Sequence, residues 1–208
     1  MAFKNFKNKY VFNVELEYPR VDQFYTFNSA TQKSEPCDKT RPGAEKSLGF
    51  RMDKIQAAAF WKEAEAHFNE CKANGADIGD FKTVHSYKEN DDGTISFRAK
   101  RKAMTNAGKL NRDVRLVDGQ NKPLPEEDWS FGTGSRGGVL FAMFPTHNPS
   151  KKEWGISLGL EAAQVTDIAV ASGGPLEFPV EEASGFGAVV SKATPSFADE
   201  LADDAIPF

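Results

Sequence analysis

The stretch Thr94-Ile95-Ser96-Phe97-Arg98-Ala99-Lys100-Arg101-Lys102 alternates between apolar and polar residues over most of its length. A period of two predicts a half-buried β-strand, because successive side chains of a strand point to opposite faces. One face carries Ile95, Phe97 and Ala99, and the other carries Ser96, Arg98, Lys100 and Lys102. A basic row on one strand face indicates a surface for a polyanion or, alternatively, a solvated face without a ligand.

Several other segments after residue 75 also carry the marks of strands. The turn Asn90-Asp91-Asp92-Gly93 precedes the basic strand. Residues 112–117 and 139–144 predict short strands, with Pro145 ending the second. Residues 154–170 predict a long last strand, in which a change of phase near Ala162-Ala163 indicates a β-bulge.

The first part of the chain predicts one strand, one loop and one helix. Residues 9–18 alternate, with Pro19 expected to end the strand, and one face is expected to carry Tyr10, Phe12, Val14, Leu16 and Tyr18. Residues 31–47 are rich in proline, glycine, serine and threonine and predict a loop.

The helix is expected over residues 54–73. Asp53 is a suitable N-cap with Gln56 three residues later, and Asn74-Gly75 supplies a stop. Its apolar stripe comprises Ala57, Phe60, Trp61, Ala64, Phe68 and Cys71. About five strands with one helix suit a small β-barrel.

Length and composition exclude several classes of protein. The chain of 208 residues suits one domain with appendages, and its 12% aromatic content indicates a packed core. The sequence has no apolar run of about 18 residues that would span a membrane, and residues 1–7 lack the apolar segment of a signal peptide. Cys37 and Cys71 are too few for a disulfide framework or a zinc module. We therefore expect a soluble, cytosolic protein without membrane association.

The net charge of −4 hides a strong asymmetry along the chain. Residues 94–116 hold seven bases and one acid, whereas residues 177–208 hold seven acids and one lysine. The first ten residues add Lys4, Lys7 and Lys9. This pattern indicates a polyanion-binding surface and a tail that competes for it, or else a solvated face and a solubilising tail.

The sequence carries no catalytic signature. The glycine-rich residues 132–138 lack the spacing of a phosphate-binding loop. The acidic pairs lie in expected turns, and the histidines His67, His85 and His147 accompany no nucleophile motif. His67 and Cys71 have the i, i+4 spacing that could hold a metal, but no further histidine or cysteine accompanies them. We therefore expect neither an enzyme nor a bound metal or cofactor.

Aromatic residues are interleaved with the bases, as single-strand binding requires. Cations contact the phosphates, and flat rings stack on unpaired bases. The candidate rings are Phe3, Phe6, Tyr10, Phe97, Phe141, Phe144 and Trp154. Core packing competes for each of them, and Phe97 is expected in the core because it faces away from Arg98. Phe144 and Trp154 are the best placed for exposure.

The last ten residues combine acids with an apolar end. Asp199, Glu200, Asp203 and Asp204 precede Ile206-Pro207-Phe208 and the terminal carboxylate. Such an end fits a hydrophobic pocket rimmed by basic residues of a partner protein. We expect residues 180–208 to form a disordered tail and residues 1–179 to form the folded domain.

The ending Asp203-Asp204-Ala205-Ile206-Pro207-Phe208 closely resembles the tip of bacterial single-stranded DNA-binding proteins. The body is similar instead to the single-stranded DNA-binding proteins of tailed bacteriophages. The matching features run in order over residues 8–172. They are the strand before Pro19, the helix over 54–73, the turn and strand over 90–97, Leu116-Val117-Asp118, Gly134-Ser135-Arg136, and Trp154-Gly155-Ile156-Ser157-Leu158.

This resemblance implies an OB-fold, which is a five-stranded Greek-key barrel, with one inserted amphipathic helix and a disordered acidic C-terminal tail. It implies a protein that binds single-stranded DNA without sequence preference during phage replication or recombination, in the cytoplasm of the infected bacterial host. The tail would contact replication or recombination proteins and occupy the DNA groove when DNA is absent. A homodimer is compatible with it. Two departures are a tail that is shorter than in many such proteins and a segment 139–144 without lysines.

The candidate DNA-binding residues combine the resemblance with the charge pattern. They are Lys7, Lys9, Arg98, Lys100, Arg101, Lys102, Lys109, Arg112, Arg115, Arg136, Phe144, His147, Lys151, Lys152 and Trp154. The candidate partner-binding residues are Asp199, Glu200, Asp203, Asp204, Ile206, Pro207 and Phe208. The alternatives are a protein-interaction adaptor whose tail mimics the bacterial tip, and a binder of duplex DNA or RNA.

Overall fold

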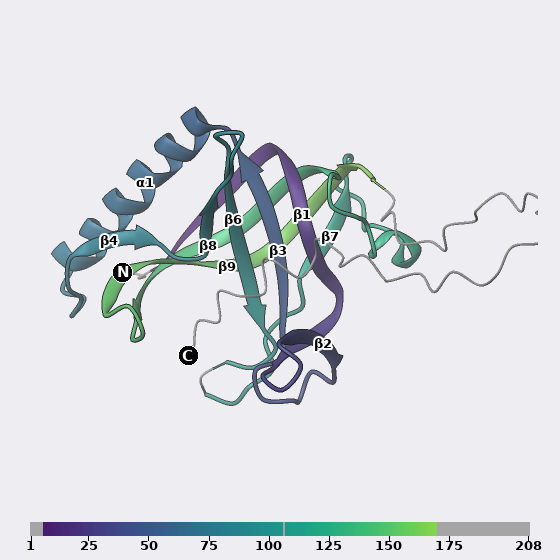
Figure 1. The fold of residues 1–208 in the computed structure, drawn as a ribbon, viewed down its shortest axis with the longest axis horizontal. Coiled ribbons are helices and arrows are strands. Elements are labelled where there is room, and N and C mark those ends of the chain that lie inside the picture. Colours follow the sequence, from purple (N-terminus) through teal and green to yellow (C-terminus); the bar gives the residue numbers. More distant parts are fainter. Residues whose placement is uncertain (1–5, 106, 170–208) are drawn as a thin grey trace, which may run out of the picture.

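Five strands close into a barrel in a computed structural model that describes residues 6–105 and 107–169 (Figure 1). The barrel strands are β1 (Lys7–Asn28), β3 (Glu45–Met52), β6 (Ile95–Lys102), β8 (Arg136–Asn148) and β9 (Glu153–Asp167). β1 pairs antiparallel with β3 and β8, β3 pairs with β6, and β8 pairs with β9. A parallel contact between Lys100 of β6 and Gly159 of β9 completes the circle. This arrangement confirms the expected OB-type barrel.

Aromatic rings from three barrel strands fill the core. Phe50 of β3 stacks on Phe97 of β6 and on Phe141 of β8, with ring centroids 5.8 and 5.4 Å apart. All three side chains are buried, as expected for Phe97. Stacked and edge-on aromatic pairs add about 0.5–1.5 kcal/mol each beyond their burial.

The helix α1 (Lys54–Ala73) has the bounds that the sequence predicts. The Asp53 side chain accepts a hydrogen bond of 2.7 Å from the backbone N–H of Gln56, and the helix ends before Asn74. The predicted stripe is buried, with Trp61 partly so, and His67 is buried with it. Phe60 meets Phe97 edge-on at 5.0 Å, so the helix packs directly on the barrel core.

Four shorter strands and one 3-10 helix complete the structure. They are β2 (Lys33–Cys37), β4 (Phe81–Val84), β5 (Tyr87–Glu89), β7 (Arg115–Asp118) and η1 (Glu126–Asp128). β2 forms a hairpin with the end of β1, and β5 forms one with β6. β4 and β7 both run parallel to β9.

Two predicted strand ends are wrong. β1 continues through Pro19 to Asn28, because a register shift between Glu17 and Arg20 places the proline where the ladder is interrupted. β8 likewise does not end at Pro145 but extends to Asn148, with Pro145 paired opposite Ile156 of β9.

The predicted loop over residues 31–47 is also wrong, since β2 and the start of β3 lie within it. The predicted face of residues 9–18 is wrong in its first half. Asn13 has a positive φ of 56° at a register shift, so Val11 turns into the core and Phe12 turns outward.

The bulge predicted near Ala162-Ala163 is confirmed. Phe141 pairs with Leu160 and Leu140 with Ala162, which leaves Glu161 as the extra residue.

The predicted acidic tail, with the boundary at residue 179 and all the candidate partner-binding residues, lies outside the described residues. Within the described ranges, no helix has the length and apolar character needed to cross a membrane.

Candidate nucleic-acid interface

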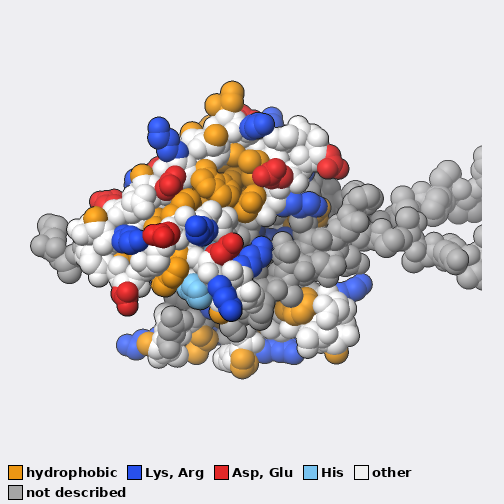
Figure 2. Space-filling view, turned by 60° about the vertical axis from the view of Figure 1, so that its left-hand side comes forward, with side chains coloured by type: hydrophobic (Ala, Val, Ile, Leu, Met, Phe, Trp, Pro, Cys, Tyr) orange, Lys and Arg blue, Asp and Glu red, His pale blue; other side chains and the backbone are white. Residues whose placement is uncertain are grey.

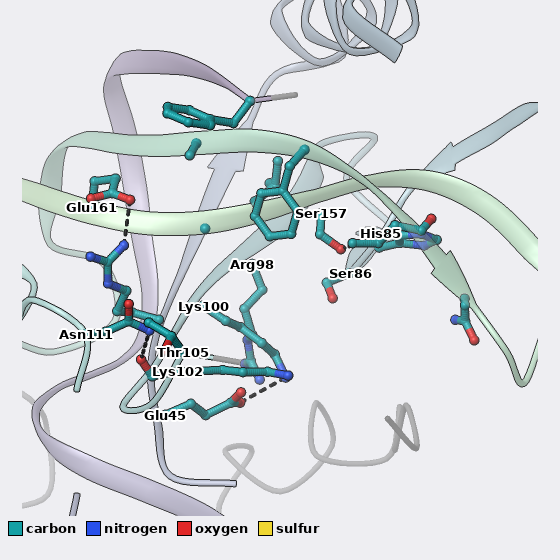
Figure 3. A pocket seen from close by; sticks show the side chains of 18 of the residues that line it. Glu45, His85, Ser86, Arg98, Lys100, Lys102, Thr105, Asn111, Ser157 and Glu161 are labelled. Atoms are coloured by element: carbon teal, nitrogen blue, oxygen red, sulfur yellow. Dashed lines mark hydrogen bonds and ion pairs between the residues drawn. The ribbon is translucent and has the colours of Figure 1, made fainter. Parts of the chain in front are cut away.

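A groove with a volume of about 650 Å³ runs along the outer face of the barrel where β6, β8 and β9 meet (Figure 3). One wall comes from Arg98, Lys100, Arg101 and Lys102 of β6. The floor comes from Ser157, Leu158 and Gly159 of β9, and Ala142, Phe144 and Thr146 of β8 lie beside it. We call this hollow the first groove.

The basic row faces the first groove because of the strand alternation. Phe97 and Ala99 are buried in the core, which directs Arg98, Lys100 and Lys102 outward, as the sequence predicts. Figure 3 shows the three side chains extending in the same direction from β6. Lys100 of β6 pairs with Gly159 of β9 in the sheet. Because Gly159 has no side chain, the Phe144 ring can lie over it, and a Cβ at Gly159 would come within 3.0 Å of that ring.

Carboxylates compensate part of this positive charge. The Lys100 ammonium lies 2.9 Å from a carboxylate oxygen of Glu45, and Arg101 donates to Glu161 at 2.6 Å. Arg98 makes no side-chain hydrogen bond or ion pair with the described residues. Burial lowers the pKa of its guanidinium, with a smaller contribution from nearby Arg20, but an arginine remains charged at neutral pH. Arg98 is therefore a partly desolvated cation, to which an anion binds more strongly than in bulk water.

Two phenylalanine rings flank the cations. Phe6, at the start of the described chain, is 48% exposed and lines the first groove together with Phe144, which is half-buried. Trp154 lies elsewhere: its ring covers Gly79 and contacts His147, with ring centroids 5.2 Å apart. The structure therefore provides Phe6 and Phe144 as rings in the groove, whereas Trp154 packs beside it.

The turn between β4 and β5 forms the end of the groove. The Nε2 atom of His85 lies 3.3 Å from the carbonyl oxygen of Thr146, and burial lowers the pKa of this histidine. His85 is therefore neutral at neutral pH and adds no charge. Ser86 has a positive φ of 60°, and its carbonyl oxygen accepts a hydrogen bond of 3.0 Å from the backbone N–H of Arg98.

A second hollow of about 430 Å³ adjoins the first groove and has His85, Ser86, Arg98, Lys100 and Asn148 in common with it. Its other walls come from β1, β3, β4, β5, the β8–β9 turn and α1. Figure 2 shows lysine and arginine side chains around a histidine near the middle of one face, with a few acidic side chains among them and apolar side chains beside them. The two hollows meet at Arg98 and Lys100.

The other predicted DNA-binding residues lie at several places. His147 lines the first groove, and Lys151 lines the second hollow, while Lys152 lies next to it in the β8–β9 turn. Lys7 and Lys9 lie 3.3 and 2.5 Å from carboxylate oxygens of Glu63 on α1. Lys109, Arg112, Arg115 and Arg136 are exposed and line neither hollow.

Several residues of the interface carry no strong signal in the sequence. Glu45 belongs to a segment that predicted a loop, and His85 and Ser86 belong to a turn without a recognisable motif. Phe6 was a candidate ring, but its position beside Phe144 depends on the pairing of β1 with β8. Each of these residues reaches the interface through pairings between distant segments.

Solved structures of phage proteins have this fold. No protein-family model matches the sequence, and no curated protein matches it significantly. The crystal structure of gp2.5, a single-stranded DNA-binding protein encoded by bacteriophage T7, superposes with a TM-score of 0.53 at 18% identity, covering 89% of this chain and all of that one.

The single-stranded DNA-binding protein from bacteriophage Enc34 in complex with single-stranded DNA gives a TM-score of 0.53 at 14% identity, covering 80% of this chain and 89% of that one. The structure of its C-terminal truncation gives a TM-score of 0.52 at 15% identity, covering 82% of this chain and 94% of that one. The chain therefore has the fold of these bacteriophage proteins.

Proposed function

We propose that this chain is a binding protein that coats single-stranded DNA without sequence preference. The observation that carries the proposal is the row Arg98, Lys100 and Lys102, which faces a groove that also holds Phe6 and Phe144. Cations along a groove and rings that accept any base are what such binding needs. The neighbours from T7 and Enc34, both named as single-stranded DNA-binding proteins, support it.

Binding in this groove exchanges one set of ionic contacts for another. A phosphate that approaches Lys100 displaces the Glu45 carboxylate, whereas Arg98 has no such partner among the described residues and binds a phosphate directly. Each neutralised phosphate releases condensed counterions, so affinity falls as salt rises. For about five neutralised phosphates, log K falls against log salt with a slope of about −3.5.

The test is a fluorescence-anisotropy titration of the full chain with a labelled strand of about 30 nucleotides, longer than the site of one OB-fold. Titrations at about 50 and 200 mM salt give the slope. Unlabelled duplex and oligouridylate of the same length serve as competitors for the duplex and RNA alternatives. We expect salt-dependent binding that the duplex displaces poorly. A folded protein that binds no strand at low salt contradicts the proposal and favours the adaptor.

The cellular role that we propose is protection of exposed strands during phage replication or recombination, in the cytoplasm of the infected bacterium. The C-terminal tip is proposed to recruit replication or recombination proteins. Removing residues 199–208 deletes four carboxylates that compete with DNA, so the truncated chain is expected to bind DNA equally or more tightly. Weaker DNA binding by a truncated chain of unchanged thermal stability contradicts this role of the tail.

A further inference from the structure

The second hollow contains a ring that is fixed in position and open to solvent. Tyr87 of β5 meets Trp61 of α1 at 86°, with ring centroids 4.8 Å apart. Trp61 itself contacts the buried Phe97, so the core supports this pair. Tyr87 nevertheless keeps 39% of its surface exposed. A ring held in this way offers a stacking surface at little cost in conformational entropy.

Three lysines that form no ion pair among the described residues line the same hollow as this ring. Lys82 of β4, Lys88 of β5 and Lys151 of the β8–β9 turn are exposed and line the hollow. Among the described residues, none of these three lysines has a carboxylate within ion-pair distance. The buried Glu17 in the same hollow accepts a hydrogen bond of 2.7 Å from Arg51, which neutralises it. Glu153 is the other acid that lines the hollow, so five bases (Lys82, Lys88, Arg98, Lys100 and Lys151) outnumber two acids there and the hollow has a net positive charge.

The second hollow continues the first groove. Arg98 and Lys100 line both, and Ser86 lies at the junction with a positive φ. The backbone N–H of His85 donates to Ile156 of β9, and the Ser86 carbonyl accepts from Arg98 of β6. This turn therefore connects β9 to β6, and the next residue, Tyr87, lines the second hollow but not the first groove.

We propose that the second hollow is an additional subsite for the same single-stranded DNA, in which Tyr87 stacks on a base and Lys82, Lys88 and Lys151 contact the backbone. This inference rests on the proposed function. A strand bound in the first groove passes over Arg98 and Lys100 and enters the second hollow. The subsite extends the length of strand that one protein molecule binds.

The test measures affinity against strand length. Labelled oligothymidylates of about 4 to 16 nucleotides cover the range of site sizes of one OB-fold. The affinity of wild type is expected to rise as the strand fills the first groove, and to rise a second time when the strand becomes long enough to reach the second hollow. Tyr87→Leu retains an apolar side chain against Trp61 but removes the flat face. We expect it to bind the shortest strands like wild type and the longest strands about 5- to 150-fold more weakly, the effect of one stacked base.

Two matched variants separate stacking from folding. Tyr87→Phe keeps the ring and is expected to bind like wild type at every length. Phe27→Leu removes a ring of similar exposure, 41%, that lines neither hollow, and is expected to change nothing. Thermal unfolding of each variant shows whether the fold is intact. Ultraviolet cross-linking to oligothymidylate, followed by mass spectrometry that assigns the adduct to a single residue, is expected to label Tyr87.

The outcomes distinguish the inference from the function on which it rests. If wild type binds no strand of any length, the proposed function fails. If wild type binds short and long strands and Tyr87→Leu has the same affinities at every length, the function stands and the second subsite is refuted. Cross-links confined to residues that line only the first groove also refute it.

Discussion

The basic row on β6 and the two lysines at the start of β1 have similar charge in the sequence but different surroundings in the structure. Arg98, Lys100 and Lys102 face the first groove. Lys7 and Lys9 both contact Glu63 of α1, and the hydrogen bond from Lys9 lowers the pKa of that carboxyl. The difference is one of position, because the β6 bases line a groove although Glu45 and Glu161 contact two of them, whereas Lys7 and Lys9 line neither hollow and are held against α1. A local excess of bases therefore predicts a binding surface only where the fold directs those bases into a groove.

The largest effect is expected from removing the β6 row. Replacing Arg98, Lys100 and Lys102 together by Gln removes three cations from the first groove. We expect affinity for a single strand to fall about 100-fold or more, because hydrogen bonds to charged groups contribute about 1.5–3 kcal/mol each. The slope of log K against log salt is expected to become less steep by about 2. Anisotropy titration at several salt concentrations measures both quantities.

The matched control replaces Lys109, Arg112 and Arg115 together by Gln. This variant has the same change in net charge, but its three residues line neither hollow. Its affinity is expected to fall much less than that of the β6 variant. Equal losses in the two triple variants would mean that net charge, rather than the groove, controls binding.

An intermediate effect of opposite sign is expected from Glu45→Gln. This change removes the carboxylate that lies 2.9 Å from the Lys100 ammonium, so a phosphate no longer has to displace that carboxylate to bind Lys100. We expect affinity to rise about threefold, within the range of a partly exposed ion pair. Glu89→Gln, an exposed carboxylate on β5 outside both hollows, is the matched control. A loss of affinity in Glu45→Gln would show that Glu45 positions Lys100 rather than competing for it.

The smallest effect on binding is expected from replacing Lys7 and Lys9 by Gln. Glu63 already holds both ammonium groups, so affinity is expected to stay within about twofold, whereas the free energy of unfolding falls by about 1 kcal/mol or less. Denaturant titration measures the second quantity. A loss of affinity comparable to that of the β6 row would support the original prediction that these lysines bind DNA and would remove the contrast between the two groups.

Elements whose evidence is local were predictable from the sequence. The helix over residues 54–73 depends on the Asp53 cap, an apolar stripe and the Asn74-Gly75 stop, which all lie within one segment. The alternation around Phe97 likewise determines which side of β6 faces the core. The bulge at Glu161 was visible as a change of phase because Leu160 and Ala163 must both be buried.

β3 was missed because both of its faces are covered, which removes the alternation. Lys46 is buried against Phe24, with its ammonium 5.1 Å from the ring centroid and 2.9 Å from a carboxylate oxygen of Asp113. Gly49 lies so close to β1 that a Cβ there would come within 2.8 Å of the Glu17 carbonyl oxygen. A lysine and a glycine in a buried strand resemble a loop until their partners are known.

The spacing of neighbouring residues was sufficient to predict the helix, the core face of β6 and the outward direction of Arg98, Lys100 and Lys102. The tertiary structure determined which cations are compensated and which residues form the two hollows. The closure of β6 on β9 and the turn at Ser86 bring Phe6, Glu45, His85 and Tyr87 to the same surface from separate segments. Such pairings between distant segments leave no periodic trace in the chain, so only the folded barrel reveals them.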